Sequence, residues 1–181
     1  MRIIAGQWRG RKLVAPKTDA TRPTADRTRE TLFSMLTSRL GSFEGLSVAD
    51  LFAGTGALGL EALSRGAGHC LFVEEEDGAA RALRANIDTL AAASQAKIVR
   101  GSVLKLGPAR EAYDLILLDP PYGTGAGCVA LDRLLRLGWI GRQTWIALET
   151  GLKEVVEVND LVIDTQRKVG KAKLTLMTKA R

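Results

Sequence analysis

The residues of this chain best suited to chemistry lie in two short motifs, and one of them is Asp119-Pro120-Pro121-Tyr122. It follows an apolar stretch that begins at Tyr113 and is typical of a buried strand. Two successive prolines fix φ and carry no N–H, so the carbonyl of Pro120 stays available as an acceptor. The motif therefore holds a carboxylate, a carbonyl and an aromatic ring in a fixed order.

This arrangement suits an exocyclic amino group of a nucleic-acid base. Such a nitrogen is a weak nucleophile, because its lone pair is delocalised into the ring. Hydrogen bonds from its two N–H groups to the Asp119 carboxylate and the Pro120 carbonyl would favour the pyramidal nitrogen that attacks a methyl carbon in line. Tyr122 is predicted to stack on the base, which must lie outside a helix. These residues alone do not distinguish guanine N2 from adenine N6 or cytosine N4, and alone the motif also fits an ordinary turn.

The second motif is glycine-rich and runs Asp50-Leu-Phe-Ala-Gly54-Thr-Gly56-Ala-Leu-Gly59, at the predicted junction of a strand and a helix. Glycines there permit a tight turn and the close approach of a ligand to the backbone. Glu74 follows Gly54 by 20 residues, the spacing expected for a carboxylate that binds ribose hydroxyls. A nicotinamide dinucleotide would satisfy this pattern about as well.

Asp50 helps to separate the two classes of cofactor. A dinucleotide places its pyrophosphate at the helix N-terminus, where an acid at the end of the preceding strand would repel it. S-adenosylmethionine carries an ammonium group and a sulfonium centre and no phosphate, so a carboxylate is a suitable neighbour. The sequence thus favours S-adenosylmethionine. The alternatives are that Asp50 caps the loop and that Glu74, with Glu75 and Glu76, forms a solvated acidic turn.

Composition and charge indicate one globular domain with basic ends. The chain has 181 residues, 46% of them hydrophobic, and a net charge of +6. Residues 1–40 hold nine Lys/Arg and three Asp/Glu, and residues 166–181 hold six Lys/Arg and no acid. We expect both ends to converge on one face that binds phosphates; charged ends that are merely solvated are the alternative.

Several features argue against other classes of protein. No apolar run is long enough to span a membrane and no leader segment is evident, so a cytoplasmic protein is expected. Cys70 and Cys128 lie far apart and are expected to pack in the fold. His69 is the only histidine, which excludes a histidine-rich metal site, and no metal is expected.

The pattern of the chain predicts an α/β fold. Residues 2–14 suggest a β-hairpin, in which Trp8 is expected to be a core residue, and a helix is expected from Thr24, as N-cap, to Leu40. Apolar strands at 46–52, 69–74, 96–100, 113–119 and 144–149 alternate with helices at 57–65, 77–92 and 126–137. This alternation implies a parallel sheet with crossover helices on both faces. Strands at 155–165 and 173–178, joined by a turn at Gly170, predict a closing antiparallel hairpin.

With the segment Arg22-Pro-Thr24-Ala-Asp-Arg27-Thr-Arg29-Glu30-Thr-Leu-Phe33, these motifs resemble the bacterial RsmD family, which methylates guanine N2 in 16S ribosomal RNA. The resemblance spans nearly the whole chain. It implies a class I S-adenosylmethionine-dependent methyltransferase (Rossmann-like) fold with a seven-stranded, mostly parallel sheet and an antiparallel last strand. An N-terminal hairpin and helix (1–44) would precede the Rossmann-like core (45–181). The expected partner is 16S rRNA in the small ribosomal subunit or its assembly intermediate, and a monomer is expected.

The resemblance also assigns roles to individual residues. The catalytic residues would be Asp119, Pro120, Pro121 and Tyr122. The cofactor site would comprise Arg22, Thr24, Asp50, Phe52, Gly54, Gly56, Glu74, Ser102, Val103 and Asp119. From the basic charge of the two ends, and not from the resemblance, RNA is expected to contact Arg9, Arg11, Lys12, Arg27 and Lys171. Ser102 stands where many methyltransferases have an acid that meets the adenine amino group, so a hydroxyl or backbone atom is expected there instead.

Three alternatives remain open. A DNA adenine-N6 methyltransferase would use the same acid-proline-proline-aromatic chemistry, but 181 residues leave little room for a target-recognition domain. A nicotinamide-dependent oxidoreductase is disfavoured by Asp50 and leaves residues 119–122 unexplained. A non-catalytic RNA-binding protein that retains a cofactor pocket is disfavoured by the intact motif.

Overall fold

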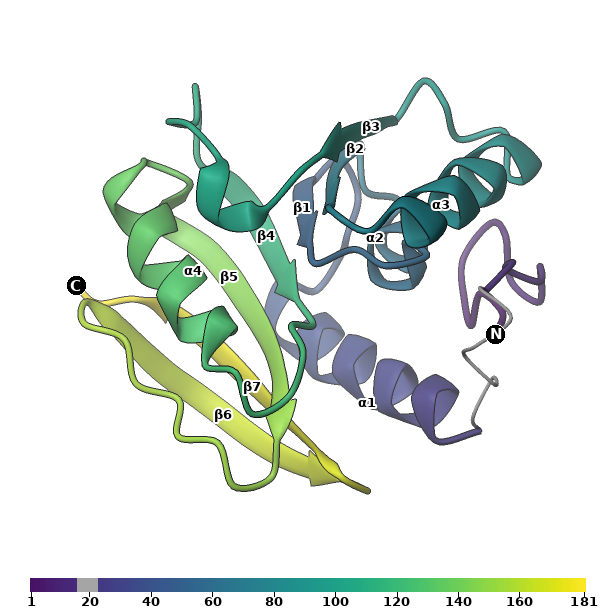
Figure 1. Cartoon of the computed structure of the whole chain (residues 1–181). Coiled ribbons are helices and arrows are strands. Elements are labelled where there is room, and N and C mark those ends of the chain that lie inside the picture. The colour runs from purple at the N-terminus through teal and green to yellow at the C-terminus, as the bar shows by residue number, and fades with distance from the viewer. Residues whose placement is uncertain (16–22) are drawn as a thin grey trace.

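Alternating strands and helices build one seven-stranded sheet with helices on both faces (Figure 1). The computed structural model describes the backbone of residues 1–15 and 23–181 and the side chains of residues 1–15 and 25–181. In chain order the elements are α1 (Pro23–Leu40), β1 (Ser47–Leu51), α2 (Ala57–Ser64), β2 (His69–Glu74), α3 (Asp77–Thr89), β3 (Ala96–Arg100), the short 3-10 helix η1 (Val103–Lys105), β4 (Tyr113–Leu118), α4 (Ala126–Arg136), β5 (Ile140–Gly151), β6 (Leu161–Val169) and β7 (Ala172–Lys179).

The order of the strands creates a crevice at one edge of the sheet. Across the sheet the order is β3-β2-β1-β4-β5-β7-β6. Strands β1 to β5 run parallel, and β7 lies antiparallel between β5 and β6. The chain direction across the sheet reverses between β1 and β4. The helices that follow these two strands therefore lie on opposite faces, which opens a crevice outside the carboxyl ends of the strands.

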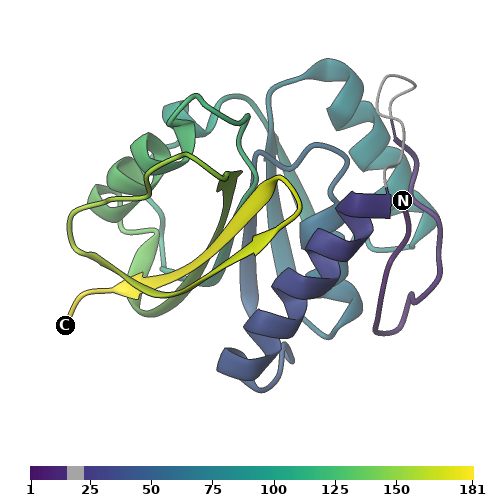
Figure 2. The ribbon, with the colours of Figure 1, turned by 90° about the horizontal axis from the view of Figure 1, so that it is seen from below.

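The sheet is buried on both faces because successive strand residues point to opposite sides. On β1, Val48 packs into one apolar core with residues of α1, α2 and α3. Its neighbour Ala49 packs into the other core with residues of α4 and η1. Seen from below, α1 lies alongside the β6–β7 hairpin (Figure 2), where Arg39 Nε binds Asp164 Oδ2 at 2.7 Å.

The predicted alternation of strands and helices is confirmed, and the differences lie at element ends. Helix α1 begins at Pro23, whose fixed φ suits the first helical position, so Thr24 lies inside the helix and is not its N-cap. The strand predicted at 155–165 is wrong in extent, because β6 spans 161–169. Its position is set by pairing with β7, in which Val169 lies opposite Ala172. Pairing between strands, which local apolarity does not report, fixed this boundary.

The N-terminal segment reverses as predicted, but its strand pairing narrows to one antiparallel bridge between Arg2 and Lys12. Backbone hydrogen bonds from Ile3 N–H to Arg11 O and from Leu13 N–H to Met1 O join its two arms, and side chains of α2 attach it to the fold. Glu61, fully buried, accepts hydrogen bonds from the N–H groups of Ile4 at 2.8 Å and Ala5 at 3.0 Å. The segment is therefore built into the fold by helix side chains.

Close packing at Gly6 completes this attachment. Gly6 has a φ of +85°, and a Cβ there would stand 1.8 Å from the carbonyl oxygen of Ser64, so the approach requires glycine. Ser64 Oγ accepts from the N–H of Trp8 at 3.0 Å. Trp8 is partly buried against the main core, as predicted. Farther along, Asn86 of α3 pairs with the backbone N–H and carbonyl of Val14 at 2.7 and 3.0 Å.

Candidate active site

The carboxyl ends of the parallel strands surround a cavity of about 920 Å³. Five of the described residues that line it are acids, and no Lys, Arg or His is among its described lining residues. Such a lining produces a negative potential that favours a positively charged ligand. The lining residues are Phe52, Gly54, Val73, Glu74, Glu75, Glu76, Gly101, Ser102, Val103, Leu104, Asp119, Pro120, Pro121, Tyr122, Thr124, Ala126 and Glu149.

The glycine-rich loop between β1 and α2 forms one wall of this cavity. Phe52 has a φ of +63°, a left-handed conformation that residues other than glycine rarely adopt, and Gly54 follows at +56°. Glu74, at the end of β2, accepts hydrogen bonds from the N–H groups of Gly54 and Glu76, both at 2.7 Å. A rare backbone conformation held by a neighbouring strand indicates a functional loop.

Asp50 lies beneath the loop, 1% exposed, and does not line the cavity. Its Oδ2 accepts from the N–H of Gly59 at 2.8 Å, and its buried Oδ1 has no hydrogen-bond partner among the described residues. Burial raises the pKa of Asp50 well above its usual value, and the charges of Asp119 and Glu74 add to that effect. Asp50 therefore supports the loop from behind, and its predicted place beside a cationic ligand stays a prediction.

Gly56 also stands behind the wall. It has a φ of +83°, and a Cβ there would lie 2.3 Å from Leu83 Cδ1, so glycine lets the loop pack on α3. Of the predicted cofactor residues, Asp50 and Gly56 are thus the two described ones that support the cavity without lining it.

The segment after β3 supplies a second, partly apolar wall. Ser102 Oγ accepts from the N–H of Leu104 at 3.3 Å and caps η1, so its hydroxyl is already engaged by the backbone. Val103 is buried, whereas Leu104 is 43% exposed and lines the cavity. No sequence motif marks Leu104, which the structure adds to the predicted lining residues.

The residues after β4 present the predicted acceptors. Among the described residues, none donates a hydrogen bond to the Asp119 carboxylate or to the carbonyl of Pro120. The next carbonyl, that of Pro121, is occupied by the hydroxyl of Thr124 at 2.7 Å. The motif therefore leaves free the two acceptors on which the predicted chemistry depends.

Two acids that the sequence analysis did not select hold the rest of this loop. Glu149, near the end of β5, accepts a hydrogen bond from the Tyr122 hydroxyl. Glu154 Oε1 accepts from the N–H groups of Gly123 at 2.7 Å and Gly151 at 2.8 Å, and these bonds lower the pKa of Glu154. The position of Glu149 after an apolar strand, like that of Glu74 after β2, is the signal that would have found it.

The electrostatics of the loop raise the pKa of both of its acids, Asp119 and Glu149. Asp119 opens onto the cavity, yet the surrounding protein removes much of its hydration, which raises the pKa of Asp119 to about 8; Glu149 adds to this. Burial also raises the pKa of Glu149, although the hydrogen bond from Tyr122 opposes this effect. Burial and the nearby carboxylates raise the pKa of Tyr122, so its hydroxyl remains a donor.

The family model described as Conserved hypothetical protein 95 matches residues 1–178. The chain belongs to this family. Ribosomal RNA small subunit methyltransferase D of Escherichia coli (strain K12) is 38% identical over 151 residues, which are 83% of this chain and 74% of that protein. The protein of the same name from Haemophilus influenzae is 39% identical over 154 residues, 83% of this chain and 78% of that protein. These relatives confirm the family inferred from the motifs.

Solved structures place the family among methyltransferases. A putative methyltransferase from Escherichia coli matches with a TM-score of 0.86 and 31% identity, covering 99% of this chain and 98% of that one. A putative methylase from Haemophilus influenzae matches with a TM-score of 0.82 and 30% identity, covering 99% and 98%. Magnesium protoporphyrin IX methyltransferase from Synechocystis has a TM-score of 0.67 at 14% identity, covering 90% and 86%, which shows the fold alone. The predicted class I methyltransferase fold is confirmed.

The predicted RNA-contacting residues of this family member come from the N-terminal segment, α1 and the β6–β7 turn. Arg9 and Lys12 are exposed on the N-terminal segment, whereas Arg11 donates to the carbonyl of Thr89 at 2.7 Å, at the end of α3. Arg27 is exposed on α1, and Lys171 is exposed at the β6–β7 turn. Arg22 lies outside the described residues, as does the side chain of Thr24.

The two termini lie apart, but the two basic segments meet where α1 packs against the β6–β7 hairpin. Two perpendicular views place the N-terminus beside α3 and the C-terminus on the far side of the sheet (Figures 1 and 2). The antiparallel course of β7 explains this, since it starts near the active-site edge and leaves in the opposite direction. Within the basic C-terminal segment, the β6–β7 turn with Lys171 lies close to Tyr122. Lys171 and Tyr122 line the same further cavity.

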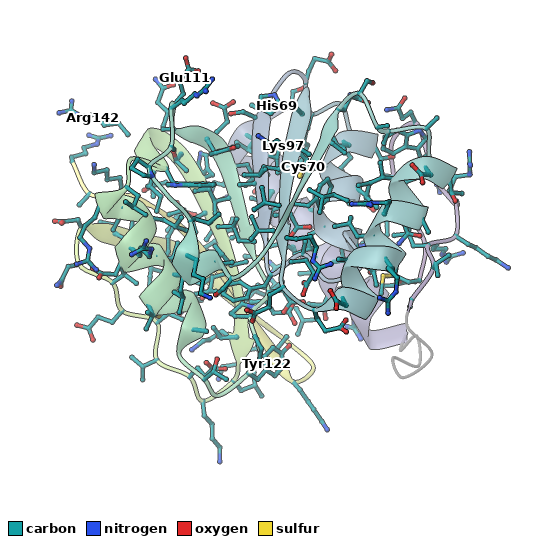
Figure 3. All side chains as sticks on the ribbon, turned by 45° about the horizontal axis from the view of Figure 1, so that its top comes forward. His69, Cys70, Lys97, Glu111, Tyr122 and Arg142 are labelled. Carbon is teal, nitrogen blue, oxygen red and sulfur yellow. The ribbon has the colours of Figure 1, made fainter. Side chains whose placement is uncertain are left out.

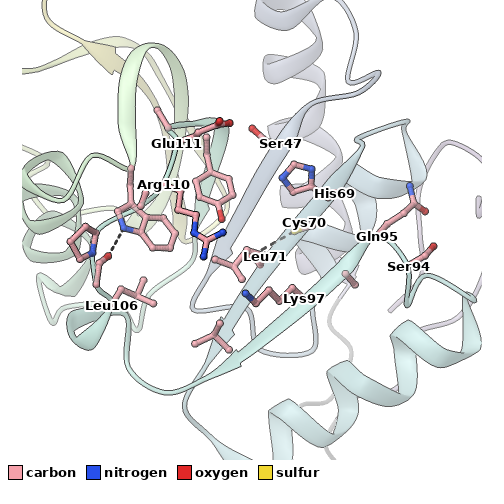
Figure 4. Close-up of a pocket in the computed structure, with 18 residues that line it drawn as sticks. Ser47, His69, Cys70, Leu71, Ser94, Gln95, Lys97, Leu106, Arg110 and Glu111 are labelled. Carbon is pink, nitrogen blue, oxygen red and sulfur yellow. Dashed lines mark hydrogen bonds between the residues drawn. The ribbon is translucent and has the colours of Figure 1, made fainter.

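A cavity of about 620 Å³ lies at the opposite, amino edge of the sheet (Figure 4). His69, Lys97, Arg110 and Glu111 line it, together with the stacked rings of Tyr113 and Trp139, whose centroids are 5.2 Å apart. Tyr122 projects from one end of the molecule and His69 and Lys97 lie near the other (Figure 3).

Among the described residues, no helix is long and apolar enough to cross a membrane.

Proposed function

We propose that this protein transfers a methyl group from S-adenosylmethionine to N2 of a guanine in 16S ribosomal RNA of the small subunit. The observation that carries the proposal is an acidic cavity that ends at two unoccupied acceptors, the Asp119 carboxylate and the Pro120 carbonyl. The names of the relatives support ribosomal RNA as the substrate. The guanine N2 atom is the finer part of the proposal and comes from the family resemblance.

The lining residues fit S-adenosylmethionine better than a dinucleotide. Five carboxylates with no cation among the described residues suit an ammonium and a sulfonium group and would repel a pyrophosphate. Asp50 supports the glycine-rich wall of the cavity from behind by accepting a hydrogen bond from the N–H of Gly59. When bound, this cofactor supplies an electrophilic methyl carbon. Glu74 would bind the ribose hydroxyls, and the apolar side of Leu104 would face the adenine ring, with Ser102 and Val103 beside it.

Asp119 and Pro120 would orient the amine that receives the methyl group. Their oxygens accept its two N–H groups, which directs the nitrogen lone pair toward the methyl carbon. The bound cofactor would supply the methyl carbon to this nitrogen. The nitrogen then carries a positive charge and loses one proton. Asp119 is placed to accept that proton, since its pKa of about 8 makes its carboxylate a better base than an ordinary aspartate.

Methyl transfer from tritiated S-adenosylmethionine tests the proposal directly. Small subunits, an assembly intermediate and free 16S RNA are incubated with the protein, and the labelled nucleoside is identified after digestion. We expect label in N2-methylguanosine. Label in N6-methyladenosine, or in no RNA, would overturn the assignment of the substrate. Calorimetry that detected binding of NAD and no binding of S-adenosylmethionine would overturn the assignment of the cofactor.

A further inference from the structure

A second cavity meets the cofactor cavity at Tyr122 and Glu149. Its volume is about 500 Å³, and both residues line the two cavities in common. The remaining lining comes from the start of α1 and from the β6–β7 turn: Ala25, Thr28, Val169, Gly170, Lys171 and Ala172. Since methyl donor and acceptor must approach from opposite sides of the transfer point, this cavity is the place for the target base.

Glu149 stands at the junction with spare capacity to accept hydrogen bonds. Among the described residues, the Tyr122 hydroxyl is its one hydrogen-bond donor, and it reaches Oε1. No described Lys or Arg forms a salt bridge with Glu149. A half-buried carboxylate without a cation is costly unless donors of a ligand satisfy it. Asp119 is the second acid at this junction. It lies near enough to Glu149 for the charge of Glu149 to raise the pKa of Asp119.

The hydrogen-bond pattern of the bases determines which ligand suits two adjacent acids. Guanine presents a row of donors, N1–H beside the N2 amino group. The amino group of adenine lies beside the acceptor N1, and that of cytosine lies beside the acceptor N3. An ionised carboxylate only accepts hydrogen bonds. Asp119 and Pro120 thus suit any exocyclic amine, whereas a further carboxylate beside them suits guanine and repels the lone pair of the other two.

We propose that Glu149 accepts the N1–H of the target guanine and so selects guanine among the bases that carry an exocyclic amine. This inference rests on the proposed function and names the residue that gives it its specificity. Burial raises the pKa of Glu149, and the hydrogen bond from the Tyr122 hydroxyl opposes this by favouring the ionised form; it also keeps the carboxylate turned toward the ring that stacks on the base. In this proposal Glu149 recognises the base through its N1–H, while Asp119 accepts a hydrogen bond from the reacting nitrogen.

The test compares guanine with 2-aminopurine at the mapped target position. 2-Aminopurine keeps the exocyclic amine but has an unprotonated N1. Ligated 16S RNAs that carry either base are assembled into subunits, and kcat/KM is measured for each. We expect wild type to prefer guanine at least about 100-fold, because a site built for a donor rejects an analogue that lacks it. Equal methylation of the two bases by wild type would overturn the proposal without any variant.

Two variants separate base reading from support of Tyr122. In Glu149→Gln the amide can donate to N1 of 2-aminopurine, so the preference should fall to within about tenfold. Tyr122→Phe removes the hydroxyl that contacts Glu149 and keeps the carboxylate, so the preference should persist. If both variants slow guanine methylation alike and both keep the wild-type preference, Glu149 only positions Tyr122 and the proposal is wrong. Calorimetry with S-adenosylmethionine verifies that each variant is folded.

The outcome for wild type on guanine distinguishes this inference from the proposed function. If wild type methylates no RNA or labels another base, the proposed function fails. If wild type methylates guanine N2 but treats 2-aminopurine as an equal substrate, only the role of Glu149 fails.

Discussion

The two edges of one sheet carry cavities of comparable size and opposite chemistry. At the carboxyl edge, five acids and no cation line the cavity among the described residues. At the amino edge, Lys97, Arg110 and His69 line the other cavity, and Glu111 is the one acid among its described lining residues. Figure 3 shows Tyr122 near one end of the molecule and His69 and Lys97 toward the other.

The difference that matters is the state of the polar groups, because volume does not separate the two cavities. At the carboxyl edge the Asp119 carboxylate, the Pro120 carbonyl and Asp50 Oδ1 lack partners among the described residues. At the amino edge Trp139 Nε1 donates to the carbonyl of Gly107 at 2.9 Å and the Tyr113 carbonyl accepts from Thr144, while the cations Lys97 and Arg110 are exposed to solvent. Unsatisfied acceptors next to a strained loop mark the edge where ligands bind.

The largest expected effect separates the two edges. Asp119→Ala should lower methyl transfer on the order of 10³-fold, the scale seen when a group that stabilises a transition state is removed. Binding of S-adenosylmethionine, measured by calorimetry, should stay within a few fold. The matched variant Lys97→Ala at the amino edge should leave both quantities unchanged. Equal loss of transfer and binding in Asp119→Ala would assign Asp119 to the cofactor site.

Removal of the aromatic ring of Tyr122 should have the next largest effect. Stacking of a base on an aromatic side chain contributes about 1–3 kcal/mol, so Tyr122→Ala should lower kcat/KM for RNA roughly 5- to 150-fold. Tyr122→Phe keeps the ring and should lose much less. Steady-state assays with saturating cofactor measure both, and equal losses would show that the hydroxyl, through Glu149, matters more than the ring.

The pH dependence of the reaction should follow the ionisation of Asp119. The pKa of Asp119 is raised from 3.8 to about 8, and the carboxylate is the form that accepts the amine. We therefore expect kcat/KM to rise about tenfold per pH unit below pH 8 and to level off above it. A profile that is flat from about pH 6 to 9 would contradict this assignment.

The raised pKa of Asp119 should make activity rise with pH but make the stability of the fold decrease with pH. Between pH 3.8 and about 8 the folded state binds more protons at Asp119 than the unfolded state. The free energy of unfolding should therefore fall as pH rises through this range. In the Asp119→Asn variant it should fall less over the same range than in wild type. Urea unfolding at about pH 5 and pH 8 measures the two slopes. Parallel slopes for wild type and variant would show that Asp119 ionises normally.

The smallest expected effect concerns the N-terminal basic residues. Replacement of Arg9, Arg11 and Lys12 by Glu should weaken RNA binding and flatten its dependence on salt, because fewer counterions are released. Filter binding at several salt concentrations measures both. The matched replacement of Lys97 and Arg110 at the amino edge should change the slope less. An unchanged slope in the N-terminal variant would leave that segment a structural role alone.

Sequence patterns predicted the elements of the sheet well and the tail less well. Period-2 burial and helical spacing are local properties, so β1 to β4 and their helices fall where their residues predict them. The ends of β5 and β6 depend on which strand they pair with, and β7 lies between them although it follows both in the chain. No local pattern reports such a partner.

The candidate site divides in the same way. Asp119 and Glu74 end apolar strands within recognisable motifs, and both line the cavity as predicted. Glu149 and Glu154 belong to no motif. They reach the Tyr122 loop because β5 pairs beside β4, which the local sequence does not report.

The sequence by itself determined the chemistry available to this protein: a carboxylate and a free carbonyl after one strand, and acids and glycines after two others. Only the tertiary structure decided which of these groups share a cavity. It buried Asp50 behind the loop, brought Glu149 to Tyr122 and placed α1 beside the β6–β7 hairpin. The reason is physical, because residue type sets what a group can bind, whereas strand order and burial set its neighbours and its charge.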